Sequence, residues 1–177
     1  MSELDNNDRV EKALRCKNLV AMVRALCDGE NDEVSLLANC ASIIHSTMGY
    51  FWTGFYMVRP CIPHSPLFQC EELRLGPFQG PVACTRIGYG KGVCGSAWKD
   101  AITIMVPDVD AFPGHIACSS LSRSEIVVPI LRSFPGKTGK IVAGVLDIDS
   151  EKPDFFDELD KQALEEVCGI ISEALYG

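Results

Sequence analysis

The sequence has no long hydrophobic run, no excess of basic residues and no apolar segment near its N-terminus. No apolar stretch approaches the ~20 residues that a membrane-spanning helix needs. The N-terminal segment MSELDNNDRVEK is polar, so we expect no secretory signal peptide. The net charge of -8 argues against partners such as nucleic acids and anionic membrane surfaces. Together these absences predict a cytoplasmic protein.

The sequence also lacks internal repeats, low-complexity tracts and linker-like segments. Its 177 residues are enough for one domain with a hydrophobic core. With 47% hydrophobic and 23% charged residues, the composition is that of a globular protein rather than a disordered chain. We therefore expect a single domain over residues 1–177.

Hydrophobic periodicity predicts helices towards both ends of the chain and strands between them. Apolar residues at helical spacing predict a helical N-terminal segment over about 8–48, with a break at DGEND and a cap at Asp32. A C-terminal helix is predicted over about 154–176, beginning at Pro153 and Asp154. Strands and loops fill about 50–149, and the strand-like segments are YFWTGFYMV, LFQCEELRL, AITIMV, SEIVVPIL and KIVAGVLDID. This order predicts an α+β layered fold.

Nine cysteines are a high number for a chain in which we expect no export signal. We expect reduced thiols, because cytosolic disulfides are usually transient and catalytic. Two cysteines, Cys61 and Cys70, lie in or beside a predicted hairpin, and no role is predicted for them. Four others fall within helical patterns and are predicted to be packing residues: Cys16, Cys27, Cys40 and Cys168.

The remaining cysteines, Cys84, Cys94 and Cys118, lie among Gly, Pro and short polar residues. This composition predicts loops, which hold reactive groups more often than core elements do. A thiol reacts as its thiolate, and further thiols on mobile loops can resolve a sulfenic acid into a disulfide. The sequence therefore favours a redox role for these three cysteines.

Two other interpretations of the same stretch are weaker. The segment GKGVCG, residues 90–95, fits the GxGxxG pattern, but the predicted elements lack the long βαβ unit of a dinucleotide site. His115 and Cys118 could bind zinc with Cys84 and Cys94, yet the CxxC spacing typical of structural zinc sites is missing. We predict no cofactor and no metal, and a zinc-stabilised interaction domain stays an alternative.

Several acidic and aromatic residues are candidates for a binding site. Asp147 and Asp149 are two apart in a predicted strand, so both side chains point to one face. They suit an ammonium group, or one of them could stay protonated as an acid, but a solvated strand edge explains the pattern equally well. Glu125 could likewise be solvated. Trp52 and Tyr56 also share a face, where core packing is the usual explanation.

Six segments of the chain are YFWTGFY, GPFQGPVACTRI, GKGVCGSA, DVDAFPGHIACSS, SEIVVPI and GVLDIDS. In this order they closely resemble the free methionine-(R)-sulfoxide reductases, enzymes built on a GAF domain. The resemblance extends from about Trp52 to the terminal helix, and generic GAF sensor domains lack this cysteine trio. It implies an α+β GAF domain with a central antiparallel sheet of about six strands, flanked by N- and C-terminal helices.

The resemblance also implies roles for single residues. Cys118 is the expected attacking thiol, Cys84 the resolving thiol and Cys94 an auxiliary redox cysteine. Five side chains are the expected substrate-binding residues: Trp52, Tyr56, Glu125, Asp147 and Asp149.

The implied activity is the reduction of free L-methionine-(R)-sulfoxide to methionine. Thiolate attack would leave a sulfenic acid, which condenses to an intramolecular disulfide that a thioredoxin-type protein reduces. The expected partners are therefore this free amino acid and a thioredoxin-type reductant, and the expected setting is oxidative stress. We expect no nucleic acid and no membrane as partners, and a homodimer is left open. The alternative is a non-enzymatic GAF domain that senses a small molecule or redox state.

Overall fold

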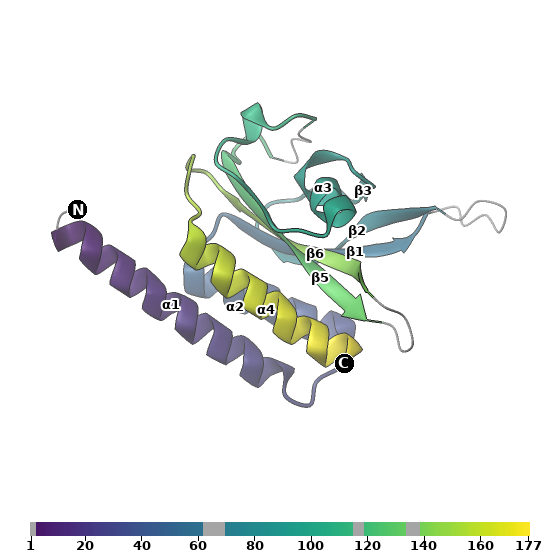
Figure 1. Ribbon diagram of the computed structural model, residues 1–177, viewed down its shortest axis with the longest axis horizontal. Helices are drawn as coiled ribbons and strands as arrows, with labels where there is room; N and C mark the ends of the chain where they lie inside the picture. Colours follow the sequence, from purple (N-terminus) through teal and green to yellow (C-terminus); the bar gives the residue numbers. More distant parts are fainter. Residues whose placement is uncertain (1–2, 62–69, 115–118, 134–138) are drawn as a thin grey trace.

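The computed structural model of the chain describes residues 3–61, 70–114, 119–133 and 139–177, without the side chains of residues 3–6. The elements that it contains are, in chain order, α1 (Glu3–Cys27), α2 (Glu33–Met48), β1 (Trp52–Pro60), β2 (Glu71–Gln79), β3 (Arg86–Gly88), α3 (Gly92–Asp100), β4 (Ile104–Val106), a 3-10 turn (Val109–Ala111), β5 (Ser124–Ser133), β6 (Lys140–Ser150) and α4 (Glu158–Tyr176) (Figure 1).

The strands form one six-stranded sheet in the order β3-β2-β1-β6-β5-β4, and every neighbouring pair is antiparallel. The first and last strands of the chain, β1 and β6, pair at the centre of this sheet. The predicted α+β class and the antiparallel sheet of six strands are both confirmed.

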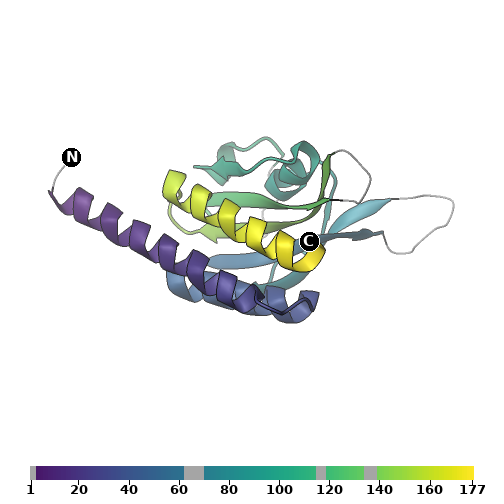
Figure 2. The same cartoon turned by 60° about the horizontal axis from the view of Figure 1, so that its bottom comes forward.

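Helices cover both faces of the sheet. In Figures 1 and 2, α1, α2 and α4 lie on one face and α3 lies on the other. The face towards the three long helices is apolar and includes Phe55, Leu146 and Ile148. The opposite face packs against α3 and includes Trp52 and Tyr56. Because strand side chains alternate between faces, Asp147 and Asp149 share the face opposite Leu146 and Ile148, as predicted, and the structure shows that this is the α3 side.

A buried ion pair fastens α1 to α4. The ammonium of Lys12 contacts the carboxylate of Asp160, which is fully buried, and lies 3.1 Å from Oδ2 of Asp157. The hydroxyl of Tyr50 donates a 3.0 Å hydrogen bond to Oδ1 of Asp160. These bonds satisfy a carboxylate that would otherwise be costly to bury.

Helix boundaries follow their caps. Asp32 accepts a hydrogen bond from the amide of Ser35 and caps α2, as predicted. The prediction that α4 begins at Pro153 and Asp154 is wrong. Asp157 caps the helix in a reciprocal capping box with Asp160, while Asp154 has φ of 50° in the preceding turn and its amide donates to the carbonyl of Pro107.

The predicted strand ends differ most in the glycine-rich part. β2 continues through Gly76 and Phe78, which were expected in a loop, because this segment pairs with Thr53 and Gly54 of β1 after a register shift. β4 is shorter than the predicted strand, since Ala101 ends α3 with a left-handed backbone at φ of 53°.

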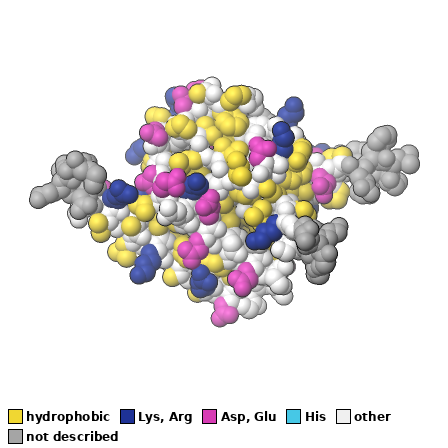
Figure 3. Space-filling model, viewed as in Figure 1, with side chains coloured by type: hydrophobic (Ala, Val, Ile, Leu, Met, Phe, Trp, Pro, Cys, Tyr) yellow, Lys and Arg dark blue, Asp and Glu magenta, His cyan; other side chains and the backbone are white. Residues whose placement is uncertain are grey.

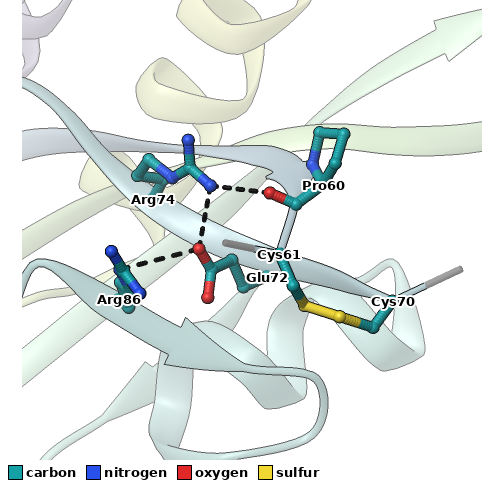
Figure 4. The surroundings of a disulfide bond; sticks show 6 residues. All are labelled: Pro60, Cys61, Cys70, Glu72, Arg74 and Arg86. Atoms are coloured by element: carbon teal, nitrogen blue, oxygen red, sulfur yellow. Dashed lines mark hydrogen bonds and ion pairs between the residues drawn. A yellow bond between two sulfur atoms is a disulfide. The ribbon is translucent and has the colours of Figure 1, made fainter. Parts of the chain in front are cut away.

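Cys61 and Cys70, for which no role was predicted, form a disulfide that joins the ends of β1 and β2 (Figure 4). The antiparallel register brings their Cα atoms to 5.5 Å, and the amide of Cys61 donates to the carbonyl of Cys70. Next to it, Arg74 bonds the Pro60 carbonyl and Glu72. The expectation of reduced thiols is therefore wrong for this pair, whose role the sequence did not indicate.

The four cysteines predicted to be packing residues lie in helices, as expected. Cys16, Cys40 and Cys168 are buried, and Cys27 is half-buried against the same core. Within the described ranges, no helix combines the length and the apolar character of a membrane span. On the face seen in Figure 3, the described basic and acidic side chains are intermixed and form no continuous basic patch.

Candidate active site

Three carboxylates meet where β1, β6 and β5 run side by side. Asp149 lies opposite Trp52 of β1 and opposite Glu125 of β5. Asp147 lies in the next row, opposite Gly54 of β1. Residues directly opposite on one face are close neighbours in an antiparallel sheet. The sheet register thus gathers the three predicted acids on the face that α3 covers.

α3 adds a thiol to this cluster. Cys94 lies in its first turn, and its Sγ is 3.9 Å from Oε1 of Glu125. The Cys94 sulfur and one carboxylate oxygen from each of Glu125 and Asp147 all lie within 4.8 Å of one another. The three residues are only 4%, 6% and 7% exposed, respectively. We call these three residues the Cys-Glu-Asp cluster.

Burial dominates the electrostatics of the cluster. It raises the pKa of Glu125 and of Asp147 well above the ordinary carboxyl range, and neighbouring carboxylates raise both pKa values further. Burial and the charges of Asp147 and Glu125 likewise raise the pKa of the Cys94 thiol. Burial also raises the pKa of Asp149 to about 6, while a hydrogen bond with Ser122 lowers it.

No positive charge in the described part of the chain balances these acids. None of its ion pairs involves Glu125, Asp147 or Asp149. Oδ1 of Asp147 is buried and has no hydrogen-bond partner. Such an arrangement favours protonated carboxyls or a cation supplied by a ligand.

An aromatic wall borders the acids and holds the loop of Cys84. Nε1 of Trp52 donates a 2.9 Å hydrogen bond to the carbonyl of Pro81, and the hydroxyl of Tyr56 donates one of 3.0 Å to the carbonyl of Cys84. The Trp52 ring stacks between Tyr56 and Phe78, at centroid distances of 6.1 and 5.5 Å. Both aromatic residues that were predicted to bind substrate therefore also position this loop.

Gly54 is a site residue that the sequence did not indicate. A Cβ atom built there would lie 2.3 Å from Cη2 of Trp52 and 2.6 Å from Cβ of Phe78. The absence of a side chain lets the indole lie across β1 beside Asp147. A lone Gly inside a strand pattern can mark such a close approach, and this signal could have identified Gly54.

The expectation that all three redox cysteines lie on loops is wrong for Cys94. It is buried in a helix beside Val93, Ala97 and Trp98. The glycines of GKGVCG explain this position: Gly92 opens α3 with φ of 60°, and a Cβ at Gly95 would lie 2.5 Å from the carbonyl oxygen of Gly88. These glycines let the short helix α3 pack closely against β3. They do not begin the long helix of a dinucleotide site.

The predicted thiols thus fall in three different settings. Cys84 is half-buried on the loop before β3, and Cys94 is buried in the first turn of α3. Cys118, the expected attacking thiol, and His115 of the proposed zinc set lie outside the described residues. Ser122, which is buried against Asp149, is a further neighbour that no sequence signal identified.

Several known proteins are similar to this chain, although no family model matches it. GAF domain-containing protein A of Dictyostelium discoideum is 46% identical over 155 residues, 88% of this chain and 89% of that protein. Free methionine-R-sulfoxide reductase of Saccharomyces cerevisiae is 40% identical over 163 residues, 89% of this chain and 84% of that enzyme.

A solved structure agrees with these relatives. Free methionine-R-sulfoxide reductase from Neisseria meningitidis, in complex with its substrate, superposes with a TM-score of 0.79 at 45% identity, covering 92% of this chain and 89% of that one. Similarity of this extent reaches from α1 to α4 and includes the sheet face on which the acids and aromatic residues meet. The chain belongs to the free methionine-R-sulfoxide reductases, a family with the GAF fold.

Proposed function

We propose that the protein is an oxidoreductase that reduces free L-methionine-(R)-sulfoxide to methionine. One observation supports this most directly: a buried group of carboxylates, for which the described residues supply no counter-ion, lies next to the aromatic wall that holds the loop of Cys84. A solved relative binds its sulfoxide substrate on the same fold.

The acids suit the free amino acid. The substrate ammonium would supply the positive charge that Asp147 and its neighbours lack among the described residues. A methionine sulfoxide within a peptide has no free ammonium, so its binding would leave buried carboxylates unpaired. The apolar faces of Trp52 and Tyr56 are suited to the side chain of the substrate. Selectivity for the free amino acid follows from this charge balance.

A protonated carboxyl is suited to the sulfoxide oxygen. The sulfur becomes a better electrophile when its oxygen accepts a proton or a strong hydrogen bond. Glu125 is the favoured donor, because burial and then the charge of Asp147 raise the pKa of its carboxyl well above the ordinary range and so favour its protonated form. Asp147 would then bind the ammonium, with Asp149 as a second candidate for the oxygen.

The redox steps balance with two thiols and an external dithiol. The Cys118 thiolate would attack the sulfoxide sulfur, and the oxygen would end on Cys118 as a sulfenic acid while methionine leaves. The Cys84 thiol would then attack the sulfenic sulfur, forming a disulfide and releasing water. A thioredoxin-type dithiol would reduce this disulfide by exchange. Cys94, buried and with a raised pKa, is assigned an auxiliary role.

The wider setting is part of the same proposal. Reduction of an oxidised amino acid belongs to the response to oxidative stress, and a thioredoxin-type partner is available in the cytoplasm. The Cys61–Cys70 disulfide does not contradict this, because the proposed cycle uses other cysteines. A homodimer is likewise proposed without a described interface.

Turnover of the purified protein tests the function. With a dithiol as reductant, we expect reduction of free L-methionine-(R)-sulfoxide, and little reduction of the S epimer or of a peptide containing the R sulfoxide. Equal rates on both epimers, or good activity on the peptide, would contradict the proposal. Tight binding of the sulfoxide without turnover would instead favour a non-enzymatic GAF sensor.

A further inference from the structure

We propose that the reduced protein binds one Zn²⁺-like divalent cation through the Cys-Glu-Asp cluster, and that this ion excludes the substrate. The ligands would be the Cys94 thiolate and one carboxylate oxygen each from Glu125 and Asp147. The first half of the proposal concerns metal binding alone. The second half, inhibition by substrate exclusion, rests on the function proposed above.

The distance between the sulfur of Cys94 and the oxygen of Glu125 is close to that expected between two ligands of a tetrahedral zinc site. With Zn–S near ~2.3 Å and Zn–O near ~2.1 Å, neighbouring ligand atoms lie about 3.4–3.6 Å apart. The three ligand atoms here lie within 4.8 Å of one another, and Cys94 Sγ is 3.9 Å from Glu125 Oε1. The sulfur–oxygen pair would need to approach by only about 0.3 Å. Three protein ligands leave a fourth position for water.

A second observation points to a missing cation. Asp147 is 7% exposed, and its Oδ1 has no hydrogen-bond partner. A buried carboxylate oxygen normally has one, so this atom indicates a ligand that the described residues do not supply. No ion pair in the described part of the chain reaches Glu125 or Asp147.

Charge and donor type decide which ion fits. One thiolate and two carboxylates sum to three negative charges, so a divalent cation neutralises the cluster better than the single ammonium of the substrate. Thiolate ligands select Zn²⁺ and Co²⁺ over Mg²⁺ and Ca²⁺, which prefer oxygen alone. Binding converts the Cys94 thiol and the Glu125 carboxyl into a metal-bound thiolate and carboxylate, and the protons of both groups leave to solvent.

This site differs from the zinc site considered from the sequence. That site used Cys84, His115 and Cys118 with Cys94, and would stabilise the fold as a resident metal. The Cys-Glu-Asp cluster shares only Cys94 with it and uses two acids of the proposed substrate site. Its ion would therefore compete with the substrate, because both need Asp147.

Titration with Co²⁺ tests the binding without any activity measurement. The reduced protein should bind one equivalent and develop a thiolate-to-cobalt charge-transfer band that Zn²⁺ abolishes and Mg²⁺ does not. Cys94→Ser should remove the band, and Asp147→Asn should weaken binding by at least about tenfold, since loss of even an outer partner costs 10–100-fold. Cys168→Ser, a buried cysteine elsewhere, is the matched control and should keep the band. Circular dichroism confirms that each variant is folded.

The cobalt titration distinguishes metal binding from exclusion of the substrate. A band that persists in folded Cys94→Ser, or no band at all in the reduced protein, overturns the metal site. If the band forms but free methionine added in excess does not diminish it, the metal site stands and the exclusion is overturned. An inactive protein that still shows the band would contradict the proposed function and leave the metal site intact.

Discussion

The hydroxyl of Tyr56 donates a 3.0 Å hydrogen bond to the main-chain carbonyl of Cys84, which ties the central strand β1 to the loop of the predicted resolving thiol. Tyr56→Phe removes this bond and keeps the ring. We expect disulfide formation to slow by about fivefold, because a lost hydrogen bond of ~1 kcal/mol changes a rate by that order. Quenched-flow analysis of free thiols after one turnover measures this step.

Tyr50→Phe is the control for Tyr56→Phe. It also removes a buried tyrosine hydrogen bond, the one that joins the segment before β1 to Asp160 of α4. We expect it to lower the melting temperature while single-turnover kinetics stay unchanged. Equal kinetic defects in both variants would mean that the Tyr56 bond acts only through stability.

Gly54→Ala should disturb the aromatic wall. The added methyl would lie 2.3 Å from Cη2 of Trp52, so the indole or the strand must shift. Overpacking of this kind costs ~1–3 kcal/mol, and we expect both a lower melting temperature and altered tryptophan fluorescence. Gly169→Ala on α4 is the control, because nothing lies within 4 Å of its Cβ and alanine favours the helix. Equal stability of the two variants would contradict the proposed close packing.

The two proposed catalytic thiols should fail at different steps. Cys118→Ser should abolish methionine release in the first turnover, because no sulfenic acid can form. Cys84→Ser should release about one equivalent and then stall, since the sulfenic acid has no resolving partner. Cys94→Ser should be milder. A stoichiometric burst of methionine from Cys118→Ser would make Cys94 the favoured nucleophile.

Replacing the buried acids should lower the activity, and replacing Glu125 should also raise the stability. The pKa of Glu125 is raised in the folded protein, so its ionised form is disfavoured there, and Glu125→Gln removes that cost. We expect a higher melting temperature at pH 8 together with a fall in kcat of ~10²–10⁴, as for a lost proton donor. Asp147→Asn should chiefly raise KM, and Asp149→Asn should also lose activity. Rates within about twofold of the parent protein for all three variants would leave these acids without a catalytic role.

The Cys61–Cys70 disulfide should contribute to stability but not to activity. It closes a loop with a sequence separation of 9, and the lost chain entropy corresponds to about 2.5 kcal/mol. The double variant Cys61→Ser, Cys70→Ser should therefore melt at a lower temperature than the oxidised parent protein, with unchanged turnover. A strong reductant should remove the difference. A double variant as stable as the oxidised parent would mean that this bond does not constrain the unfolded chain.

Local spacing by itself determined much of this protein. The period of two in LDID places Asp147 and Asp149 on the face opposite Leu146 and Ile148, whatever the strand pairs with. Helical periodicity likewise located α1, α2 and α4, because their apolar stripes depend on neighbours along the chain. The order of the motifs indicated the family.

Only the tertiary structure decided which of these residues meet. The register of β1, β6 and β5 brings Gly54, Asp147 and Glu125 to one place, and the β1–β6 pairing joins residues as far apart in the sequence as Gly54 and Asp147. The seating of α3 against β3 buries Cys94, although glycines around a thiol predict a loop. The β1–β2 register brings the Cα atoms of Cys61 and Cys70 to 5.5 Å, where a disulfide can form. The number of residues between two cysteines does not reveal this distance, so the sequence alone could not predict the bond.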